Sequence, residues 1–400
     1  MNAPNAQQLI AQNAQMRAAL LATSPRMRKN LGTFTGGAAG GTTRVKLYNV
    51  GIITRLMLRV SVALDIATGP QVLGNQGPFN LINRVRLTDF DGTDRVNCSG
   101  YELFMANVRR RGGYYGYNND SAAAVINNPV IPTAAAANKT LQFYIEIPLA
   151  YNPNAELLIS PSADLRGAIL AQTALGEMYL NIDWNSVLWQ SGNDDAVYTA
   201  AVNAVTQNAA NNISVQVWQE FLLPQTLGGQ VPLPQLDLLT VYELAGAIKS
   251  SDNIAANTEK LINFPNVRSV IAAHLRYVEN GVMQPCATLT TAGAATTTTN
   301  NLLQFRVIAN GNNILYDNTA EGHLIEQRLN LDCAGGDFRP GSFIFDFTTK
   351  PIETALYGNV QLGVTPSSAT ATTYQPYLGV MFESFYTKGA TLPGMSQASG

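Results

Sequence analysis

Hydrophobic residues occur along most of this chain in short runs that Pro, Gly and Asn separate. From Arg44 onward these runs are rich in Val, Ile, Leu and aromatic residues, which is typical of β-strands joined by turns. They cover residues 50–64, 141–147, 178–184, 213–223, 261–264, 267–278, 302–308, 343–347, 360–364 and 377–385. Helical periodicity is weak outside the N-terminus and short segments such as residues 101–109. The pattern therefore predicts an all-β protein with long loops.

The N-terminal segment has a different pattern. Residues 1–30 are predicted to form a helix that Ser24-Pro25 ends, with Leu9, Met16 and Leu20 on one face. The glycine run at residues 36–41 follows. No Gly-Lys-Ser/Thr comes after it, so a flexible hinge is favoured over a phosphate-binding loop.

The strand-like runs form an internal repeat of about half the chain. Collinear pairs carry it: Asn49-Val50 with Asn266-Val267, Leu58-Arg59 with Leu275-Arg276, Arg84-Val85 and Gly100 with Arg306-Val307 and Gly322, Gly176 to Ile182 with Gly358 to Val364, and Val215 to Glu220 with Leu378 to Glu383. Their shared order predicts two copies of one β-sandwich. The expected boundaries are 1–42 (helical arm and hinge), 43–223 (first sandwich), 224–234 (Pro-rich linker), 235–388 (second sandwich) and 389–400 (tail).

Composition limits the function. Only 13% of the 400 residues are charged and the net charge is −2, which excludes a disordered chain and a generally basic nucleic-acid binder. Such a surface suits dense packing against further copies of the chain. The three cysteines are far apart, which favours buried free thiols over a single disulfide and gives zinc no support. With no signal peptide and no long apolar stretch, we expect synthesis in the cytoplasm.

Several collinear segments resemble the major capsid proteins of tectivirus-type phages, which are icosahedral bacteriophages with an internal membrane. The segments are Asn49-Val50-Gly51-Ile52, Asn80 to Val85, Pro148-Leu149-Ala150-Tyr151, Leu233 to Leu238 with Tyr242-Glu243-Leu244, and Lys350-Pro351-Ile352 with Leu356 to Val360. The resemblance implies a double jelly roll, that is, two stacked eight-stranded β-sandwiches with an N-terminal helix. It also implies pseudo-hexameric homotrimers, with the N-terminal helix under the tile near the membrane.

The N-terminal charge distribution indicates an anionic partner. No acidic residue precedes Asp65, whereas Arg17, Arg26, Arg28 and Lys29 all lie in the first 30 positions. Anionic lipid headgroups and DNA both fit these charges, and the apolar stripe of Leu9, Met16 and Leu20 favours a membrane surface. The alternative is a helix that packs on a neighbouring subunit.

Two further clusters of charged residues can be interpreted either as structural features or as binding sites. Arg109, Arg110 and Arg111, followed by tyrosines, favour a solvated loop or an inter-subunit contact over a single-stranded nucleic-acid site. Residues 89–94 spell part of a calcium loop without its closing Glu, so an Asp-Gly hairpin turn is favoured. His274 and His323 have no accompanying nucleophile motif, so we expect structural roles.

The sequence thus predicts a structural, non-enzymatic capsid protein of a phage virion that needs no cofactor. Its expected partners are itself, other capsid and vertex proteins, and the lipids of the internal membrane, with no sequence-specific nucleic acid. A vertex spike or lectin-like recognition protein is the alternative, and a glycosidase on a jelly-roll scaffold is a third. The low-complexity stretches at residues 200–212 and 288–301 are expected to form exposed tower loops.

Overall fold

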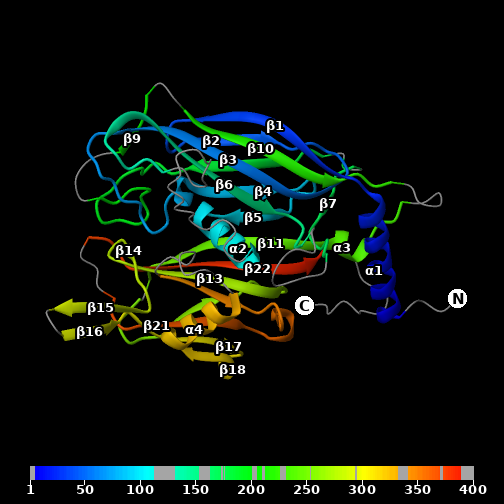
Figure 1. Cartoon of the computed structure of the whole chain (residues 1–400). Helices are drawn as coiled ribbons and strands as arrows, with labels where there is room; N and C mark the ends of the chain where they lie inside the picture. The colour runs from blue at the N-terminus through cyan, green and yellow to red at the C-terminus, as the bar shows by residue number, and fades with distance from the viewer. Residues whose placement is uncertain are drawn as a thin grey trace.

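The computed structural model describes residues 5–111, 131–152, 163–172, 174, 176–200, 205–209, 212–225, 231–252, 254–292, 295–331, 341–369 and 373–388. Within them the chain is mostly β and forms two sandwiches side by side, with helix α2 between them and helix α1 at one end (Figure 1). None of the helices in these ranges combines the length and apolar character needed to cross a bilayer.

The first sandwich consists of two sheets with strand orders β1-β10-β3-β6 and β2-β8-β4-β5. This is the arrangement of an eight-stranded jelly roll. The eight strands are β1 (Arg26–Gly37), β2 (Thr42–Lys46), β3 (Ile52–Ile66), β4 (Ile82–Thr88), β5 (Asp94–Cys98), β6 (Ala136–Pro148), β8 (Tyr179–Trp184) and β10 (Ile213–Leu222). Short strands β7 (Ile169–Leu170) and β9 (Val205–Gln207) pair with β3. Helices η1 (Phe79–Leu81) and α2 (Gly100–Arg111) complete this roll.

The second sandwich repeats this order. Its sheets pair as β11-β22-β13-β19 and β12-β21-β17-β18. The strands are β11 (Thr240–Ser250), β12 (Lys260–Asn263), β13 (Ser269–Glu279), β17 (Leu302–Ala309), β18 (Asn313–Thr319), β19 (Ser342–Asp346), β21 (Val360–Pro366) and β22 (Tyr377–Thr387). The smaller elements are β14 (Val282–Met283), β15 (Ala287–Ala292), β16 (Ala295–Asn300), β20 (Ile352–Glu353), α3 (Gln235–Leu239), α4 (Ala320–Leu331) and η2 (Thr354–Leu356).

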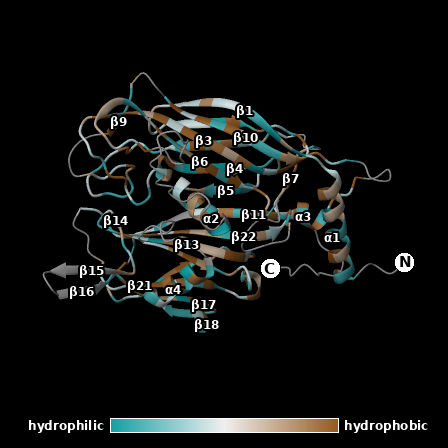
Figure 2. Cartoon of the chain, viewed as in Figure 1, coloured by the Kyte–Doolittle hydropathy of each residue, from teal (hydrophilic) through white to brown (hydrophobic). Residues whose placement is uncertain are grey.

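A parallel pairing joins the two rolls. Leu244 and Ala245 of β11 lie opposite Val96 and Asn97 of β5, so one sheet of the first roll continues into one sheet of the second. The hydrophobic core of the first roll continues into the second roll through residues such as Leu244, Ile344 and Met381, and a separate core lies inside the second roll. Figure 2 shows hydrophobic residues along the strands of both rolls.

Period-two alternation explains how the strands form their cores. In β3 the side chains of Leu56, Leu58 and Val60 are buried, while Met57 and Arg59 between them are half-buried on the opposite face. Successive side chains of a strand point to opposite faces, so this spacing fills the sandwich on one side only.

The strand registers confirm the internal repeat and shift part of its alignment. Leu87 pairs with Leu180 in the first roll, and Val307 pairs with Leu362 in the second. Leu180 and Leu362 are repeat equivalents, so Leu87 corresponds to Val307. The pairing of Val85 with Val307 in the sequence repeat is therefore wrong by two positions. The corrected alignment also makes α2 and α4 equivalent over their full 12 residues each.

The N-terminal arm differs from the sequence expectation. Helix α1 (Ala6–Thr23) ends where Ser24-Pro25 predicted, and Asn5 caps its start. Residues 26–37 then form strand β1, which pairs with β10 from Arg26 to Gly37, so the first roll begins at Arg26 rather than at residue 43. The glycine run is not a free hinge. A Cβ on Gly36 would lie 2.1 Å from Thr43 Oγ1 and 2.2 Å from Trp184 Nε1.

The described parts of the low-complexity stretches contain some β-structure. Within residues 288–301, β15 and β16 pair as a hairpin that projects beyond the second roll (Figure 1). Within residues 200–212, β9 pairs with the end of β3 and Val205 is buried. The exposed-tower assignment stays a prediction, and residues 201–204 and 210–211 lie outside the described residues.

His323 of α4 makes the second core sensitive to acid. Its ring stacks on Phe345 at 4.2 Å between centroids, and its Nδ1 lies 2.7 Å from the Tyr316 hydroxyl. Burial lowers the pKa of His323 from 6.5 to about 4. The folded protein therefore resists protonation that the unfolded chain accepts, and stability present above pH 6.5 is lost as the pH falls toward 4.

We expect His323→Leu to remove this acid sensitivity, because Leu103 occupies the equivalent position in the first roll. Between pH 7 and pH 5 the wild-type protein should lose about 2 kcal/mol more unfolding free energy than the variant. Urea unfolding at both pH values measures the difference. Equal losses in the two proteins would show that His323 does not titrate in this way.

Candidate functional site

Helix α2 lies between the two rolls, and two consecutive arginines near its end are buried. The exposed fractions of Arg109 and Arg110 are 1% and 0%. The prediction of a solvated or inter-subunit loop is therefore wrong for these two residues, because they lie in a helix inside the chain's own interface. Arg111 ends the same helix, and its side chain lies outside the described part of the structure.

Arg109 binds the second roll. Its Nε and Nη2 donate to the two carboxylate oxygens of Glu383 on β22, at 2.8 and 2.7 Å. His274 Nε2 lies 2.6 Å from Glu383 Oε1, and the Tyr242 hydroxyl donates to Oε2. Burial alone would raise the pKa of Glu383, but the charge and hydrogen bonds of Arg109 lower this pKa below its usual value. Glu383 is thus held ionised inside the protein.

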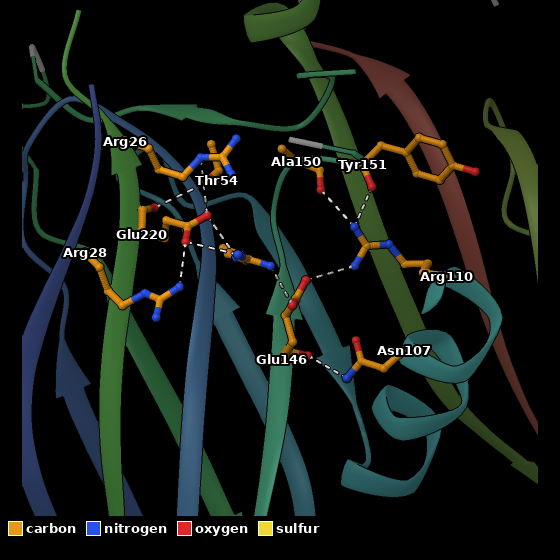
Figure 3. Close-up of polar contacts among 10 residues, drawn as sticks. Arg26, Arg28, Thr54, Asn107, Arg110, Glu146, Ala150, Tyr151 and Glu220 are labelled. Carbon is orange, nitrogen blue, oxygen red and sulfur yellow. Dashed lines mark hydrogen bonds and ion pairs between the residues drawn. The ribbon is translucent and has the colours of Figure 1, made fainter. Parts of the chain in front are cut away.

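Arg110 binds the first roll. Its Nη1 lies 3.4 Å from Glu146 Oε1 on β6, and its Nη2 donates to the backbone carbonyls of Ala150 and Tyr151 (Figure 3). Asn107, one turn earlier, donates to the Glu146 carbonyl at 2.9 Å. These contacts fix α2 to the end of β6.

The ion pair between Arg110 and Glu146 is the first of several that extend across the first sheet. Arg55 of β3 bridges two carboxylates, with Nη1 at 3.1 Å from Glu146 and Nε at 2.9 Å from Glu220 of β10. Arg28 of β1 lies 3.2 Å from Glu220 and Arg26 lies 4.0 Å from it (Figure 3). A chain of alternating charges therefore links the N-terminal strand to α2.

We call the contact between α2 and the second roll the seam, formed by Tyr101, Glu102, Met105 and Arg109 of α2 against His274, Arg276, Ser342 and Glu383. Besides the Arg109 pair, Glu102 lies 3.5 Å from Arg276, and the Tyr101 hydroxyl bonds to Ser342. All eight side chains are buried. The seam fixes how the two rolls sit against each other.

The predicted arm residues are mostly engaged within the chain. Arg17 lies 3.2 Å from Asp237 of α3, and Leu20 is fully buried in a small cluster with Ile52 and Leu222. The Lys29 ammonium lies 3.4 Å from the centre of the Tyr48 ring. Arg26 and Arg28 share the Glu220 carboxylate with Arg55, so their charges are only partly neutralised.

Two large apolar side chains of α1 are exposed beside its exposed glutamines. Ile10 and Met16 are 62% and 43% exposed, and Leu9 is half-buried. Asn13, on the docked side, accepts from the Leu236 backbone and donates to Asp237. The helix is therefore held against the start of the second roll by its polar residues.

The remaining candidates have structural roles. Residues 89–94 form the turn between β4 and β5, where Lys388 and Arg95 both bind the Asp89 carboxylate. No group of three His, Cys, Asp or Glu suited to a metal occurs among the residues that the structure describes. Cys98 and Cys286 are buried free thiols, and Cys333 lies outside the described residues.

Two jelly rolls of one strand order in a single chain define a double jelly-roll protein. Solved structures that this chain resembles include viral capsid proteins. The STIV major capsid protein, from Sulfolobus Turreted Icosahedral Virus, matches with a TM-score of 0.62 at 10% identity, covering 91% of this chain and 97% of that one. The PBCV-1 virus capsid matches with a TM-score of 0.54 at 12% identity, covering 91% and 94%.

The sequence comparisons identify the family. Residues 3–223 match the family described as "P3 major capsid protein N-terminal", and the chain belongs to this family. The major capsid protein P3 of Enterobacteria phage PRD1 is 27% identical over 383 residues, covering 90% of this chain and 88% of that protein.

The family match confirms the predicted function. The chain is a non-enzymatic, structural major capsid protein of a bacteriophage virion, and the spike, lectin and glycosidase alternatives are set aside. The tectivirus resemblance and the double jelly roll are confirmed as well.

Sequence reasoning missed the carboxylates that neutralise the buried arginines. Glu146, Glu220 and Glu383 each stand in a strongly apolar strand run. Glu220 and Glu383 are also repeat equivalents. An acidic residue retained in both copies of a buried strand indicates a buried cation beside it, because an unpaired buried charge is very costly.

We expect Glu383→Gln to lower the unfolding free energy by about 3–5 kcal/mol, because the Arg109 charge would stay buried without its counter-charge. Urea unfolding measures this loss. The matched control is Asp94→Asn, which breaks the exposed pair with Arg86 and should cost less than about 1 kcal/mol. Similar costs for the two variants would show that the seam does not depend on the Arg109–Glu383 pair.

Proposed function

We propose that the chain assembles as homotrimers that tile an icosahedral shell around an internal membrane enclosing the genome. The observation that carries the trimer is the repeated jelly roll. Three chains with two similar rolls each present six rolls, so threefold symmetry gives a nearly sixfold outline that tiles a surface with one gene product.

The two ends of the molecule carry different elements, which supports an inner and an outer surface for the shell. Helix α1 lies at one end of the rolls, and the β15–β16 hairpin projects at the opposite end (Figure 1). We propose that the α1 end faces the membrane and that the hairpin end faces outward. Other capsid and vertex proteins would bind at the rims of the tile.

The proposed membrane contact uses exposed apolar side chains as well as charge. Arg17 is paired with Asp237, and Arg26 and Arg28 share Glu220 with Arg55, whereas Ile10 and Met16 are exposed. One helix with two exposed apolar side chains binds a bilayer weakly. Many trimers in a shell add their contributions by avidity.

The trimer is tested by size-exclusion chromatography with light scattering on the full chain. We expect a mass three times 42.9 kDa that persists on dilution to micromolar concentration. Obligate interfaces of this type commonly bury over ~2,000 Å², which explains the expected persistence. A folded monomer at that concentration would contradict the proposal.

The membrane contact is tested with Ile10→Asp combined with Met16→Asp. We expect normal trimers but less protein bound to lipid vesicles and fewer membrane-containing particles, since carboxylates oppose insertion into an apolar layer. Gln12→Asp with Gln15→Asp is the matched control, because it adds the same charge at two exposed polar positions of α1. If both pairs of substitutions behave alike, the exposed Ile10 and Met16 side chains have no specific role.

A further inference from the structure

A small cavity lies within the seam, between α2 and the outer face of the second roll. Its volume is about 10 Å³, which is just enough for one water molecule. Helix α2 contributes Glu102 and Met105 to its lining, and β13 contributes His274 and Arg276. These four side chains are at most 5% exposed, so the lining is shielded from bulk solvent.

Three buried polar atoms of this lining have no hydrogen-bond partner among the residues that the structure describes. They are Oε1 of Glu102, Nδ1 of His274 and Nε of Arg276. A buried polar atom without a partner is costly, and native proteins leave few of them. Three such atoms around one cavity therefore indicate a partner that they share.

Other atoms of the same side chains are bound, which holds the side chains in place. Glu102 Oε2 accepts from the Ser99 backbone at 2.8 Å, and His274 Nε2 lies 2.6 Å from Glu383 Oε1. Arg276 Nη2 lies 3.5 Å from Glu102 Oε1, which is too long for a good hydrogen bond. The three unpartnered atoms therefore stay at the cavity and are not satisfied by one another.

The partner of His274 determines which ring nitrogen carries the hydrogen. The Glu383 carboxylate is ionised and can only accept, so Nε2 of His274 donates to it. In the neutral ring Nδ1 is then an acceptor. The charges of Arg109 and Glu383 cancel, as do those of Arg276 and Glu102, so a neutral His274 leaves the seam without net charge.

Gly379 of β22 provides the space in which Arg276 reaches the cavity. The two residues are paired across β13 and β22, and Gly379 also lines the cavity. A Cβ at Gly379 would lie 2.5 Å from Arg276 Nε and would displace the guanidinium group. The glycine therefore keeps the Nε donor at the cavity wall.

We propose that one internal water molecule occupies this cavity and completes the seam. The water accepts from Arg276 Nε and donates its two hydrogens to Glu102 Oε1 and His274 Nδ1. Three hydrogen bonds are the usual number for a buried water. The site lies within a single chain, so it exists whether or not the proposed trimer forms.

The chemistry of the lining favours water over an ion. The Arg276 guanidinium repels a metal cation, and the Glu102 carboxylate repels an anion. An apolar group would leave all three polar atoms without partners. Water offers two donors and an acceptor without net charge, which matches the two acceptors and one donor of the lining.

The proposed water adds a link between the rolls to the Arg109–Glu383 pair. It joins Glu102, on the helix of the first roll, to His274 and Arg276 of β13 in the second. A bridging water is enthalpically nearly as favourable as a direct hydrogen bond. It therefore completes the contact between Glu102 and Arg276, whose direct distance is long.

The site is tested by a crystal structure of the full-length protein at a resolution that shows ordered water. We expect one water peak within hydrogen-bond distance of Glu102 Oε1, His274 Nδ1 and Arg276 Nε. Tyr101→Phe is the matched control, because it removes a hydroxyl from the same lining but none of the three partners, and it should keep the peak. A wild-type cavity without a peak would overturn the inference.

A double variant tests which residues hold the water. Glu102→Met with Arg276→Met removes both charges together, so no unpaired charge stays buried. Two of the three partners are then gone, and we expect the peak to be lost. A peak that persists at the same place would show that these residues do not hold the water.

Nuclear magnetic resonance tests the same site without changing the seam. The chain has two histidines, so ¹⁵N-histidine labelling of the His323→Leu variant leaves only the signals of His274. We expect the hydrogen on Nε2, none on Nδ1, and transfer of magnetisation from water to Nδ1 in sedimented protein. A hydrogen on Nδ1, or no transfer from water, would contradict the proposed hydrogen bonds even if the double variant failed to fold.

Discussion

The structure depends on two consecutive arginines that point to different rolls. Neighbouring positions on an α-helix are rotated by about 100°, so Arg109 and Arg110 of one helix can point to different rolls. Arg109 reaches Glu383 in the second roll, and Arg110 reaches Glu146 in the first. Both guanidinium groups are buried, so separating either from its carboxylate would leave an uncompensated charge. Helix α2 therefore fixes the angle between the rolls on which any pseudo-sixfold tile depends.

The two equivalent helices carry different chemistry at matching positions. The face of α2 that contacts the second roll carries Arg109, and Glu383 of that roll neutralises its charge. On α4 the equivalent positions are Ile325 and Leu329, which can meet water before assembly at modest cost. An unpaired arginine buried at the same position would be far more costly.

Much of the fold could be predicted from the sequence because the relevant signals are local. The strand-like runs and the shared order of the repeated strands predicted two β-sandwiches, the family resemblance implied that these are jelly rolls, and Ser24-Pro25 predicted the end of α1. The roles of the charged residues could not be predicted in this way. Arg109 and Glu383 are 274 positions apart, and nothing near Arg109 in the sequence distinguishes a buried arginine from a solvated one. Gly36 was likewise taken as part of a hinge, although the contact that requires glycine comes from Thr43 and Trp184.

The partners of the basic arm bear on the proposed membrane contact. An anionic lipid would have to compete with Asp237 for Arg17, and with Glu220 for Arg26 and Arg28. Glu220 is shared with Arg55 as well, so it offsets only part of the arginine charge, and the exposed apolar side chains add to the attraction that remains. Fully burying an exposed Ile or Met side chain contributes roughly 1.5–3 kcal/mol, and α1 offers two of them. A single chain would therefore bind a bilayer weakly and reversibly, and stable contact would arise only after the lattice has collected many copies of α1 on one surface.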